Sequence, residues 1–186
     1  MRKAFGFILV AVALIGALSA QAADTVASAQ LKTIASLDVP RYMGRWYEVA
    51  KYPNRFQKEC VADTSATYSL NPDGTVQVIN RCRQKNGAFE KAIGQARQVG
   101  DLGSPKLKVR FAPAWLSFLP FVWGDYWVID IDSNYQLVAV SEPKREYLWV
   151  LSRGPTVDEQ SYRNLLGRLS SMGFDVTKLE PTRQGQ

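Results

Sequence analysis

Trp46 and Arg153 are the two residues whose chemistry could join distant parts of this chain. Trp46 stands in the segment Gly44–Tyr47, and Arg153 ends the far later segment Tyr147–Arg153. A guanidinium stacked on an indole face forms a cation–π pair, which is strongest where both groups are shielded from water. Such a pair could seal one end of a closed β-barrel. The two segments therefore predict a cup with a closed floor, and a cup usually holds a ligand.

Residues that could carry catalysis or bind a metal are scarce. The sequence contains no histidine, which removes the commonest general base and the commonest ligand of transition metals. It contains no glycine-rich phosphate loop and no metal-binding cysteine spacing. Asp130 and Asp132 are two residues apart next to a turn, where solvated carboxylates are the ordinary expectation. We therefore predict no catalytic residue, no metal and no cofactor.

Cys60 and Cys82 are the two cysteines of the chain, and they flank the predicted turn Asn71–Gly74. In an oxidising compartment an even number of cysteines favours a disulfide. Strict hairpin pairing across that turn places Cys82 opposite residue 63 rather than opposite Cys60. A disulfide therefore requires a bulge or a bend in residues 60–63, and the alternative is two free thiols.

The N-terminus has the pattern of a secretory signal peptide. Arg2 and Lys3 precede an apolar run over residues 5–18, and Ala20-Gln21-Ala22 supplies the small residues of a cleavage site. The run is short for a membrane-spanning helix, so we predict a signal peptide over residues 1–22. The alternative is a membrane anchor that stays attached. No cysteine lies near the cleavage site, so a lipid has no acceptor there.

The rest of the chain has the length of one domain. Residues 23–36 are small and polar and predict a flexible leader, whereas residues 37–182 predict the folded domain. Gly94 indicates a bulge or bend in the fourth strand. Turn signals separate eight short segments with strand patterns, which is typical of an all-β barrel or sandwich; they are 46–52, 64–70, 75–81, 89–99, 106–112, 126–132, 136–141 and 147–153.

One helix is predicted after the last strand. Thr156 and Glu159 have the spacing of a capping box, with Thr156 as the N-cap. Apolar residues then recur at three- and four-residue spacing up to Met172, and Gly173 suits the position just after a helix. This single apolar stripe predicts a helix packed on the outside of the barrel.

The net charge of +6 does not indicate a nucleic-acid-binding protein. The positive residues are interleaved with apolar ones, as in 81–85 and 106–110, which fits the polar faces of strands. Weak attraction to anionic lipid head groups is compatible with the same pattern.

Three motifs in this order resemble the lipocalin family. Gly44-x-Trp46 opens the first predicted strand, residues 126–135 resemble the second family motif, and Arg153 ends the eighth strand. The second motif departs from the usual Thr-Asp-Tyr wording, because Ile131-Asp132-Ser133 stands there. Residues 41–50, 66–70 and 147–153 are similar to the branch of the bacterial lipocalin Blc and apolipoprotein D.

The resemblance covers roughly residues 37–180. It implies an all-β fold, an eight-stranded antiparallel up-and-down barrel with one C-terminal α-helix packed outside. It also implies that Gly44, Trp46 and Arg153 close the barrel floor, which is a structural role.

The same resemblance implies an apolar, aromatic cavity with ligand-binding residues at Tyr68, Asn80, Phe111, Trp127 and Trp149. Strand alternation places Trp149 and Leu151 on the face of Arg153. From the other strand we expect Trp127 and Ile129 to line the lumen. The alternative is that large aromatic side chains simply fill a small barrel.

Residues 112–124 form the least ordinary stretch of the chain. Two prolines exclude a regular strand or helix there, and no charge occurs before Asp125. The stretch resembles the proline-rich hydrophobic loop of plant temperature-induced lipocalins, and exposed apolar patches usually mark an interface. We expect its aromatic residues to contact a membrane surface or a second copy in a homodimer; they are Trp115, Phe118, Phe121 and Trp123. The alternative is a loop that folds back on the core.

Together these observations predict a non-catalytic protein that binds, stores or transports an amphipathic lipid in the bacterial cell envelope. The expected ligand is a fatty acid or a lysophospholipid, with peripheral membrane contact through residues 113–123 or a homodimer, and no nucleic acid. We expect the protein to be exported and periplasmic, or associated with the outer membrane without a lipid anchor. One alternative is a stress-protective envelope protein that acts through its apolar loop with a filled barrel. The other is a lipid-modifying enzyme.

Overall fold

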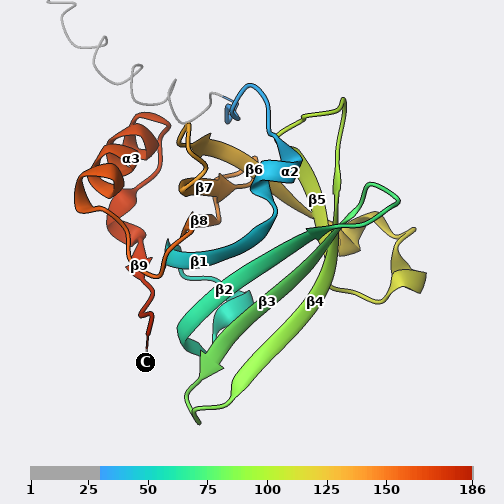
Figure 1. Cartoon of the computed structure of the whole chain (residues 1–186), viewed down its shortest axis with the longest axis horizontal. Coiled ribbons are helices and arrows are strands. Elements are labelled where there is room, and N and C mark those ends of the chain that lie inside the picture. Colours follow the sequence, from blue (N-terminus) through green and yellow to red (C-terminus); the bar gives the residue numbers. More distant parts are fainter. Residues whose placement is uncertain (1–29, 186) are drawn as a thin grey trace, which may run out of the picture.

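The computed structural model describes residues 30–185 and contains one antiparallel sheet that closes on itself (Figure 1). The strand order is β2-β3-β4-β5-β6-β7-β8-β1-β9, and β1 also pairs with β2, which closes the barrel. This confirms the predicted eight-stranded barrel and adds the two-residue strand β9. The predicted signal peptide and residues 23–29 of the predicted leader lie outside the described residues.

The strands and helices follow the sequence patterns closely. The strands are β1 (Gly44–Lys51), β2 (Cys60–Leu70), β3 (Val76–Gln84), β4 (Phe89–Gln98), β5 (Lys106–Arg110), β6 (Gly124–Ile131), β7 (Leu137–Ser141), β8 (Leu148–Ser152) and β9 (Glu180–Pro181). The α-helices are α2 (Val39–Tyr42) and α3 (Glu159–Ser171), and the short 3-10 helices are η1 (Arg55–Gln57), η2 (Ala114–Leu116), η3 (Pro120–Val122) and η4 (Val176–Lys178). No helix within the described part of the chain is long and apolar enough to cross a membrane.

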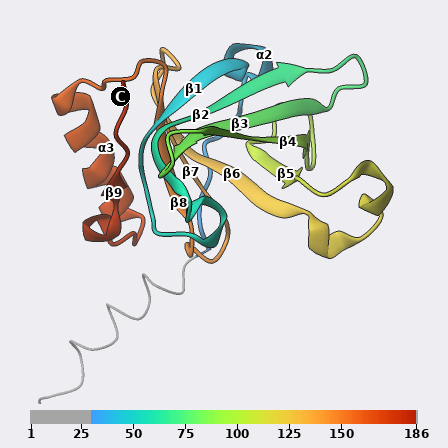
Figure 2. The same cartoon turned by 90° about the horizontal axis from the view of Figure 1, so that it is seen from below.

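Two apolar clusters lie on opposite faces of the barrel wall. The inner cluster fills the lower lumen around Trp46, with Val128, Val138 and Val140 from β6 and β7. The outer cluster combines alternate residues of the same strands, among them Ala139, with the buried face of α3. The alternation arises because successive side chains of a strand point to opposite faces. In Figure 2, α3 lies on one side of the barrel and the β5–β6 loop on the other.

The β2–β3 hairpin carries the disulfide. Cys60 and Cys82 are bonded, with their Cα atoms 5.5 Å apart. The pairing of β2 with β3 shifts register between Cys60 and Ala62 and again between Ala62 and Ser65. Asp63 has a left-handed φ of 52° within this stretch. The bulge that the sequence required over residues 60–63 is therefore present. Cys60 pairs with Gln84 in the strand register, and the disulfide reaches diagonally from Cys60 to Cys82.

Helix α3 begins two residues later than the predicted N-cap implied. Asp158, not Thr156, is the N-cap, because its carboxylate accepts a hydrogen bond from the Ser161 N–H at 2.8 Å. An aspartate satisfies an unpaired amide at a helix start as well as threonine does. Gly173 follows the helix with a φ of 86°, which confirms its predicted left-handed position. Leu165 and Leu169 are fully buried against the outer face of the barrel.

The predicted flexible leader differs from the structure over residues 30–36. Leu31 is 3% exposed and belongs to the outer cluster. The Ile34 N–H donates to the carbonyl of Val128 at 3.2 Å. The buried side chain of Leu31 and the backbone hydrogen bond of Ile34 hold this short segment against the barrel, and no periodicity in the sequence indicates either contact.

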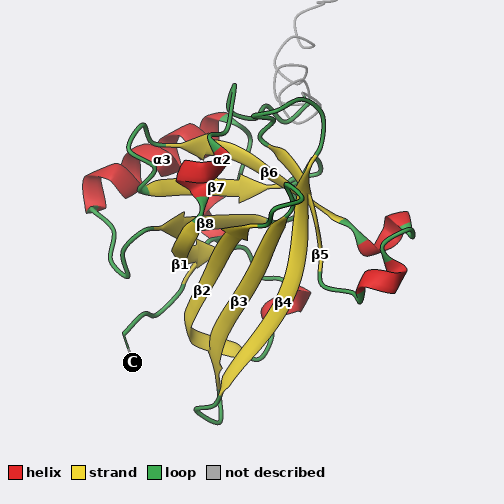
Figure 3. Cartoon of the chain, turned by 45° about the vertical axis from the view of Figure 1, so that its right-hand side comes forward, coloured by secondary structure: helices red, strands yellow, loops and turns green. Residues whose placement is uncertain are grey.

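Gly94 does not mark a bulge, because the pairing of β3 with β4 is unbroken from Val76 to Arg83. A Cβ atom at Gly94 would lie 2.6 Å from the carbonyl oxygen of Arg110 and 2.7 Å from the ring of Phe111. The glycine thus makes room for the end of β5. Beyond Arg110 the chain leaves the sheet, and Figure 3 shows the loop with its short helical turns projecting away from the barrel.

Candidate ligand cavity

Arg153 closes the floor of the barrel against Trp46. Its guanidinium carbon lies 3.9 Å from the centroid of the indole ring, and Trp46 is fully buried. The same guanidinium donates to the carbonyls of Arg45 at 3.0 Å, Arg41 at 2.7 Å and Tyr135 at 3.3 Å. The arginine therefore ties the last strand to the segment before β1 and to the β6–β7 turn.

Gly44 is required at this floor for two reasons. Its φ of 94° lies in the left-handed region that side chains rarely adopt, and a Cβ atom would lie 3.2 Å from the Arg153 guanidinium. The three residues predicted to close the barrel, Gly44, Trp46 and Arg153, thus meet in space.

A cavity of about 760 Å³ occupies the barrel above this floor. Four of the five predicted ligand-binding residues border it: Tyr68 from β2, Asn80 from β3, Phe111 after β5 and Trp149 from β8. Leu151 also borders it, as strand alternation from Arg153 predicted. Apolar side chains from several strands complete the lining, including Val76, Val78, Ala96, Leu107 and Val109.

Trp127 does not face the cavity, and this prediction was wrong. Its ring belongs to the outer cluster, and the ammonium of Lys106 lies 4.3 Å from the ring centroid. Ile129, expected beside it in the lumen, is also in the outer cluster. The preceding residue, Tyr126, occupies the inner face instead. Tyrosine and tryptophan are both suited to a lumen, so residue type did not indicate which of the two neighbours points inward.

Three tyrosine hydroxyls meet inside the cavity. The Tyr126 hydroxyl lies 2.6 Å from that of Tyr42 and 3.0 Å from that of Tyr68. Burial raises the pKa of Tyr68 to about 12 and raises the pKa values of Tyr42 and Tyr126 well above the ordinary value of a tyrosine. All three groups are therefore neutral hydroxyls at physiological pH.

Tyr42 and Tyr126 were missed as cavity residues by sequence reasoning. Tyr42 lies in the short helix α2, outside any strand, so strand alternation could not place it. Tyr126 could have been found only by choosing the other parity for β6.

A second polar group lies higher in the cavity. The Glu48 carboxylate is 2% exposed and accepts hydrogen bonds from the Gln57 amide at 2.6 Å and the Thr182 hydroxyl at 2.5 Å. The Gln57 carbonyl accepts from the Trp149 indole N–H at 3.0 Å. Burial raises the pKa of Glu48, and the two hydrogen bonds oppose that rise. This network joins β1, η1, β8 and the C-terminal segment.

The β5–β6 loop stands at the open end of the barrel. Its side chains Trp115, Phe118 and Phe121 are 73%, 75% and 80% exposed. Trp123 differs from them, because it is half-buried: its indole N–H donates to the Ser117 carbonyl at 2.8 Å. The guanidinium carbons of Arg97 and Arg110 lie 4.5 and 5.2 Å from its ring centroid. Phe121 and Trp123 also border the cavity, so the loop forms part of its mouth.

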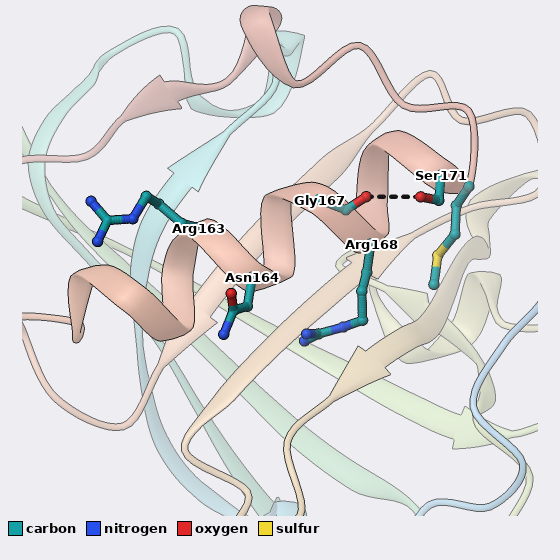
Figure 4. A pocket seen from close by; sticks show the side chains of 6 residues that line it. Arg163, Asn164, Gly167, Arg168 and Ser171 are labelled. Atoms are coloured by element: carbon teal, nitrogen blue, oxygen red, sulfur yellow. Dashed lines mark hydrogen bonds between the residues drawn. The ribbon is translucent and has the colours of Figure 1, made fainter.

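A second, shallow hollow lies on the outer surface of α3 (Figure 4). It is lined by Arg163, Asn164, Gly167, Arg168, Ser171 and Met172, of which only Met172 is partly buried. Arg168 is engaged by the Asp130 carboxylate through contacts of 2.7 and 2.9 Å. The hollow offers no desolvated surface, so the barrel cavity is the candidate ligand site.

Comparisons with known proteins agree with this geometry. Residues 37–184 match the family model described as "Lipocalin-like domain". The chain is 43% identical over 158 residues to "Temperature-induced lipocalin-1" of Arabidopsis thaliana, covering 83% of each chain. It is 38% identical over 144 residues to "Outer membrane lipoprotein Blc" of Escherichia coli K12, covering 77% of each. It is 31% identical over 156 residues to "Apolipoprotein D" of Mus musculus, covering 80% of this chain and 78% of the relative.

Solved structures show the same fold at low sequence identity. Insecticyanin from the tobacco hornworm Manduca sexta superimposes with a TM-score of 0.67 at 19% identity, covering 84% of this chain and 85% of that one. The cockroach allergen Per a 4 superimposes with a TM-score of 0.64 at 19% identity, covering 85% and 96%. At this identity the likeness concerns the fold alone.

Proposed function

The chain belongs to the lipocalin family, and from that premise we propose that it binds an amphipathic lipid, a fatty acid or a lysophospholipid, in the barrel cavity. The single observation that carries this proposal is the cavity itself, about 760 Å³ of space lined mainly by apolar and aromatic side chains above a sealed floor. A filled barrel would leave no such space. The function is binding, storage or transport, without catalysis.

The driving force is desolvation of the acyl chain. Each methylene group moved from water into the apolar cavity contributes about 0.8 kcal/mol before the cost of ordering the ligand. Phe111 and Trp149 offer ring surface to the chain, and Tyr68 and Asn80 offer polar contacts to oxygen atoms of the ligand. A long acyl chain can therefore reach micromolar affinity.

We place this activity in the bacterial cell envelope. The Cys60–Cys82 disulfide supports an exported protein, because such bonds persist in oxidising compartments. The Blc relatives are named outer membrane lipoproteins. The proposed location is the periplasm, in contact with the outer membrane but without a lipid anchor of its own.

The β5–β6 loop supports a peripheral contact with a membrane surface. Three exposed aromatic side chains, Trp115, Phe118 and Phe121, form its tip, and Phe121 also borders the cavity. The exposed Arg97 beside Trp123 adds positive charge next to this apolar tip, which favours an anionic lipid surface. Insertion of the loop would bring the cavity mouth to the lipid from which a ligand is taken.

Lipid binding is tested with delipidated protein. We expect titration with palmitate and with lysophosphatidylcholine to quench tryptophan fluorescence saturably, and native mass spectrometry of protein from its own envelope to show one retained lipid. Absence of both saturable quenching and retained lipid would favour the filled-barrel alternative. Steady release of a product from the bound lipid would contradict a non-catalytic role.

Membrane contact is tested with the variant Trp115→Ser/Phe118→Ser/Phe121→Ser. We expect it to lose binding to phosphatidylglycerol-containing vesicles in a flotation assay. Leu102→Ser is the matched control, because Leu102 is 99% exposed but lies in the β4–β5 loop at the other end of the barrel. Unchanged vesicle binding by the triple variant contradicts the proposal. Loss of a dimer in size-exclusion chromatography, with vesicle binding retained, would assign the loop to a homodimer instead.

A further inference from the structure

The tyrosine cluster of Tyr42, Tyr68 and Tyr126 has one more hydroxyl proton than it uses. Each hydroxyl carries one proton, and within residues 30–185 the three make two hydrogen bonds, both with one another. Each hydrogen bond uses one proton. Whichever way the hydroxyls rotate, one O–H is therefore left as a donor without an acceptor in the cluster.

The spare donor lies beside the cavity and near its floor. All three tyrosines border the cavity. The ring of Tyr42 lies 5.1 Å from that of Trp46 and 5.5 Å from that of Tyr68, so the cluster forms the layer next to the floor. The hydroxyl proton that the cluster does not use is therefore available to the cavity, where a ligand oxygen could accept a hydrogen bond from it.

Burial disfavours a negative charge beside these hydroxyls, and Arg153 offsets part of that cost. The positive charge of Arg153 lowers the pKa values of Tyr42 and Tyr68 against the larger, opposite effect of burial. Its field therefore reaches the hydroxyl cluster from below and would stabilise an anionic oxygen placed there. When Tyr126 donates to such an oxygen, Tyr42 and Tyr68 can both donate to Tyr126, which strengthens the donor.

We propose that this cluster is the recognition point for the carboxylate of a fatty acid, which enters head-first with its acyl chain extending toward the rim. This inference rests on the proposed function and names the ligand class of the same cavity. It favours a fatty acid over a lysophospholipid, because a bulky phosphodiester head group would have to reach the closed floor of the barrel.

The first test compares two probes on the unmodified protein. Tetradecanoate carries two acceptor oxygens, whereas tetradecylammonium has the same chain length and no acceptor. We expect tetradecanoate to bind at least about tenfold more tightly, as a charge-assisted hydrogen bond in a dry site allows. Equal affinities would overturn the inference while leaving the proposed function intact. No binding of either probe or of lysophosphatidylcholine would overturn both.

The second test removes the hydroxyl groups that supply the unused O–H donor. Every single Tyr→Phe change in the cluster still leaves an unused donor, so the informative variant is Tyr42→Phe/Tyr68→Phe/Tyr126→Phe. We expect this variant to bind tetradecanoate at least about tenfold more weakly and tetradecylammonium unchanged. Tyr47→Phe is the matched control, because Tyr47 does not border the cavity.

Stability separates recognition from a structural role. Replacing an under-satisfied hydroxyl cluster by isosteric apolar rings is expected to leave the melting temperature of the ligand-free protein unchanged or raised. Equal loss of affinity for both probes would mean that the hydroxyls only shape the cavity. No loss of affinity for either probe would mean that water, not the ligand, accepts the hydrogen bond from the unused O–H. Both results overturn the inference. Should the triple variant not fold, the probe comparison on the unmodified protein decides.

Discussion

Tyr126 and Trp127 are neighbours in β6, yet their side chains lie on opposite faces of the barrel wall. The Tyr126 hydroxyl contacts Tyr42 and Tyr68 inside the cavity, whereas the Trp127 ring packs in the outer cluster with the residues of α3. Adjacent positions of one strand therefore face different surroundings: Tyr126 faces the cavity, and Trp127 faces the helix α3. Substitutions at the two positions should separate binding from stability.

Trp149 and Trp127 should respond differently to a bound lipid. We expect Trp149→Phe to reduce the quenching caused by a brominated fatty acid, because Trp149 borders the cavity, and Trp123, which also borders it, to account for quenching that remains. Trp127→Phe should leave the quenching unchanged and lower the free energy of unfolding by about 1–3 kcal/mol, because it opens a gap in the outer cluster. Fluorescence titration and urea unfolding measure the two effects. Strong loss of quenching in the Trp127 variant would contradict the assigned faces.

Arg153 should stabilise the barrel without contributing to ligand affinity through direct contact. Arg153→Met removes the stacking on Trp46 and three hydrogen bonds to backbone carbonyls. We expect the free energy of unfolding to fall by about 2–4 kcal/mol, measured by urea denaturation. Arg45→Met is the control, because Arg45 is exposed, and it should change stability by less than about 0.5 kcal/mol. Equal effects of the two variants would refute the role of the floor contact.

The Cys60–Cys82 bond should contribute to stability through the unfolded chain. It closes a loop with a sequence separation of 22 residues. Constraining a loop of this size stabilises a folded protein by about 3 kcal/mol. We expect Cys60→Ser/Cys82→Ser to show this loss in urea denaturation, and dithiothreitol to reproduce it in the unmodified protein but not in the variant. Coincident unfolding curves with and without dithiothreitol would show that the bond contributes nothing.

Glu48 should make stability depend on pH in the direction opposite to a carboxylate whose pKa is lowered on folding. Burial raises its pKa in the folded state above the ordinary value of 4.5. The folded protein therefore holds this proton more tightly than the unfolded chain, so the stabilising contribution is complete below 4.5 and is lost as pH rises through the raised pKa.

The test compares Glu48→Gln with the unmodified protein. The glutamine keeps the shape of the side chain that contacts Gln57 and Thr182 but cannot ionise. We expect the unmodified protein to lose stability relative to this variant as pH is raised from about 4 to neutrality, measured as the difference between their melting temperatures. A difference that does not vary with pH would rule out ionisation of Glu48 as its source.

Local patterns in the sequence predicted most of the fold. Alternation over short segments gave the eight strands, the spacing of leucines after Asp158 gave α3, and hairpin geometry required the irregularity near Cys60. A contact between Gly44, Trp46 and Arg153 could be predicted because each is the single glycine, tryptophan or arginine that its family motif requires. These features depend on interactions between near neighbours or on chemistry carried by a single side chain.

Tertiary structure alone decided which side chains face the ligand. Tyr126 and Trp127 are both aromatic, so the sequence did not show which of the two points into the barrel. The register shift between Val128 and Asp130 also prevents the inward-facing positions from being counted back from the end of β6. Tyr42 enters the cavity from a helix, and Leu31 anchors the segment that precedes it. The sequence by itself determined eight strands followed by one helix, because period and residue type are local, and its family motifs implied a closed barrel sealed by Trp46 and Arg153. The tyrosine cluster forms only when closure of the barrel brings three separate segments together. A hydroxyl bonds whichever polar group lies within reach, so its partners depend on where the backbone places them.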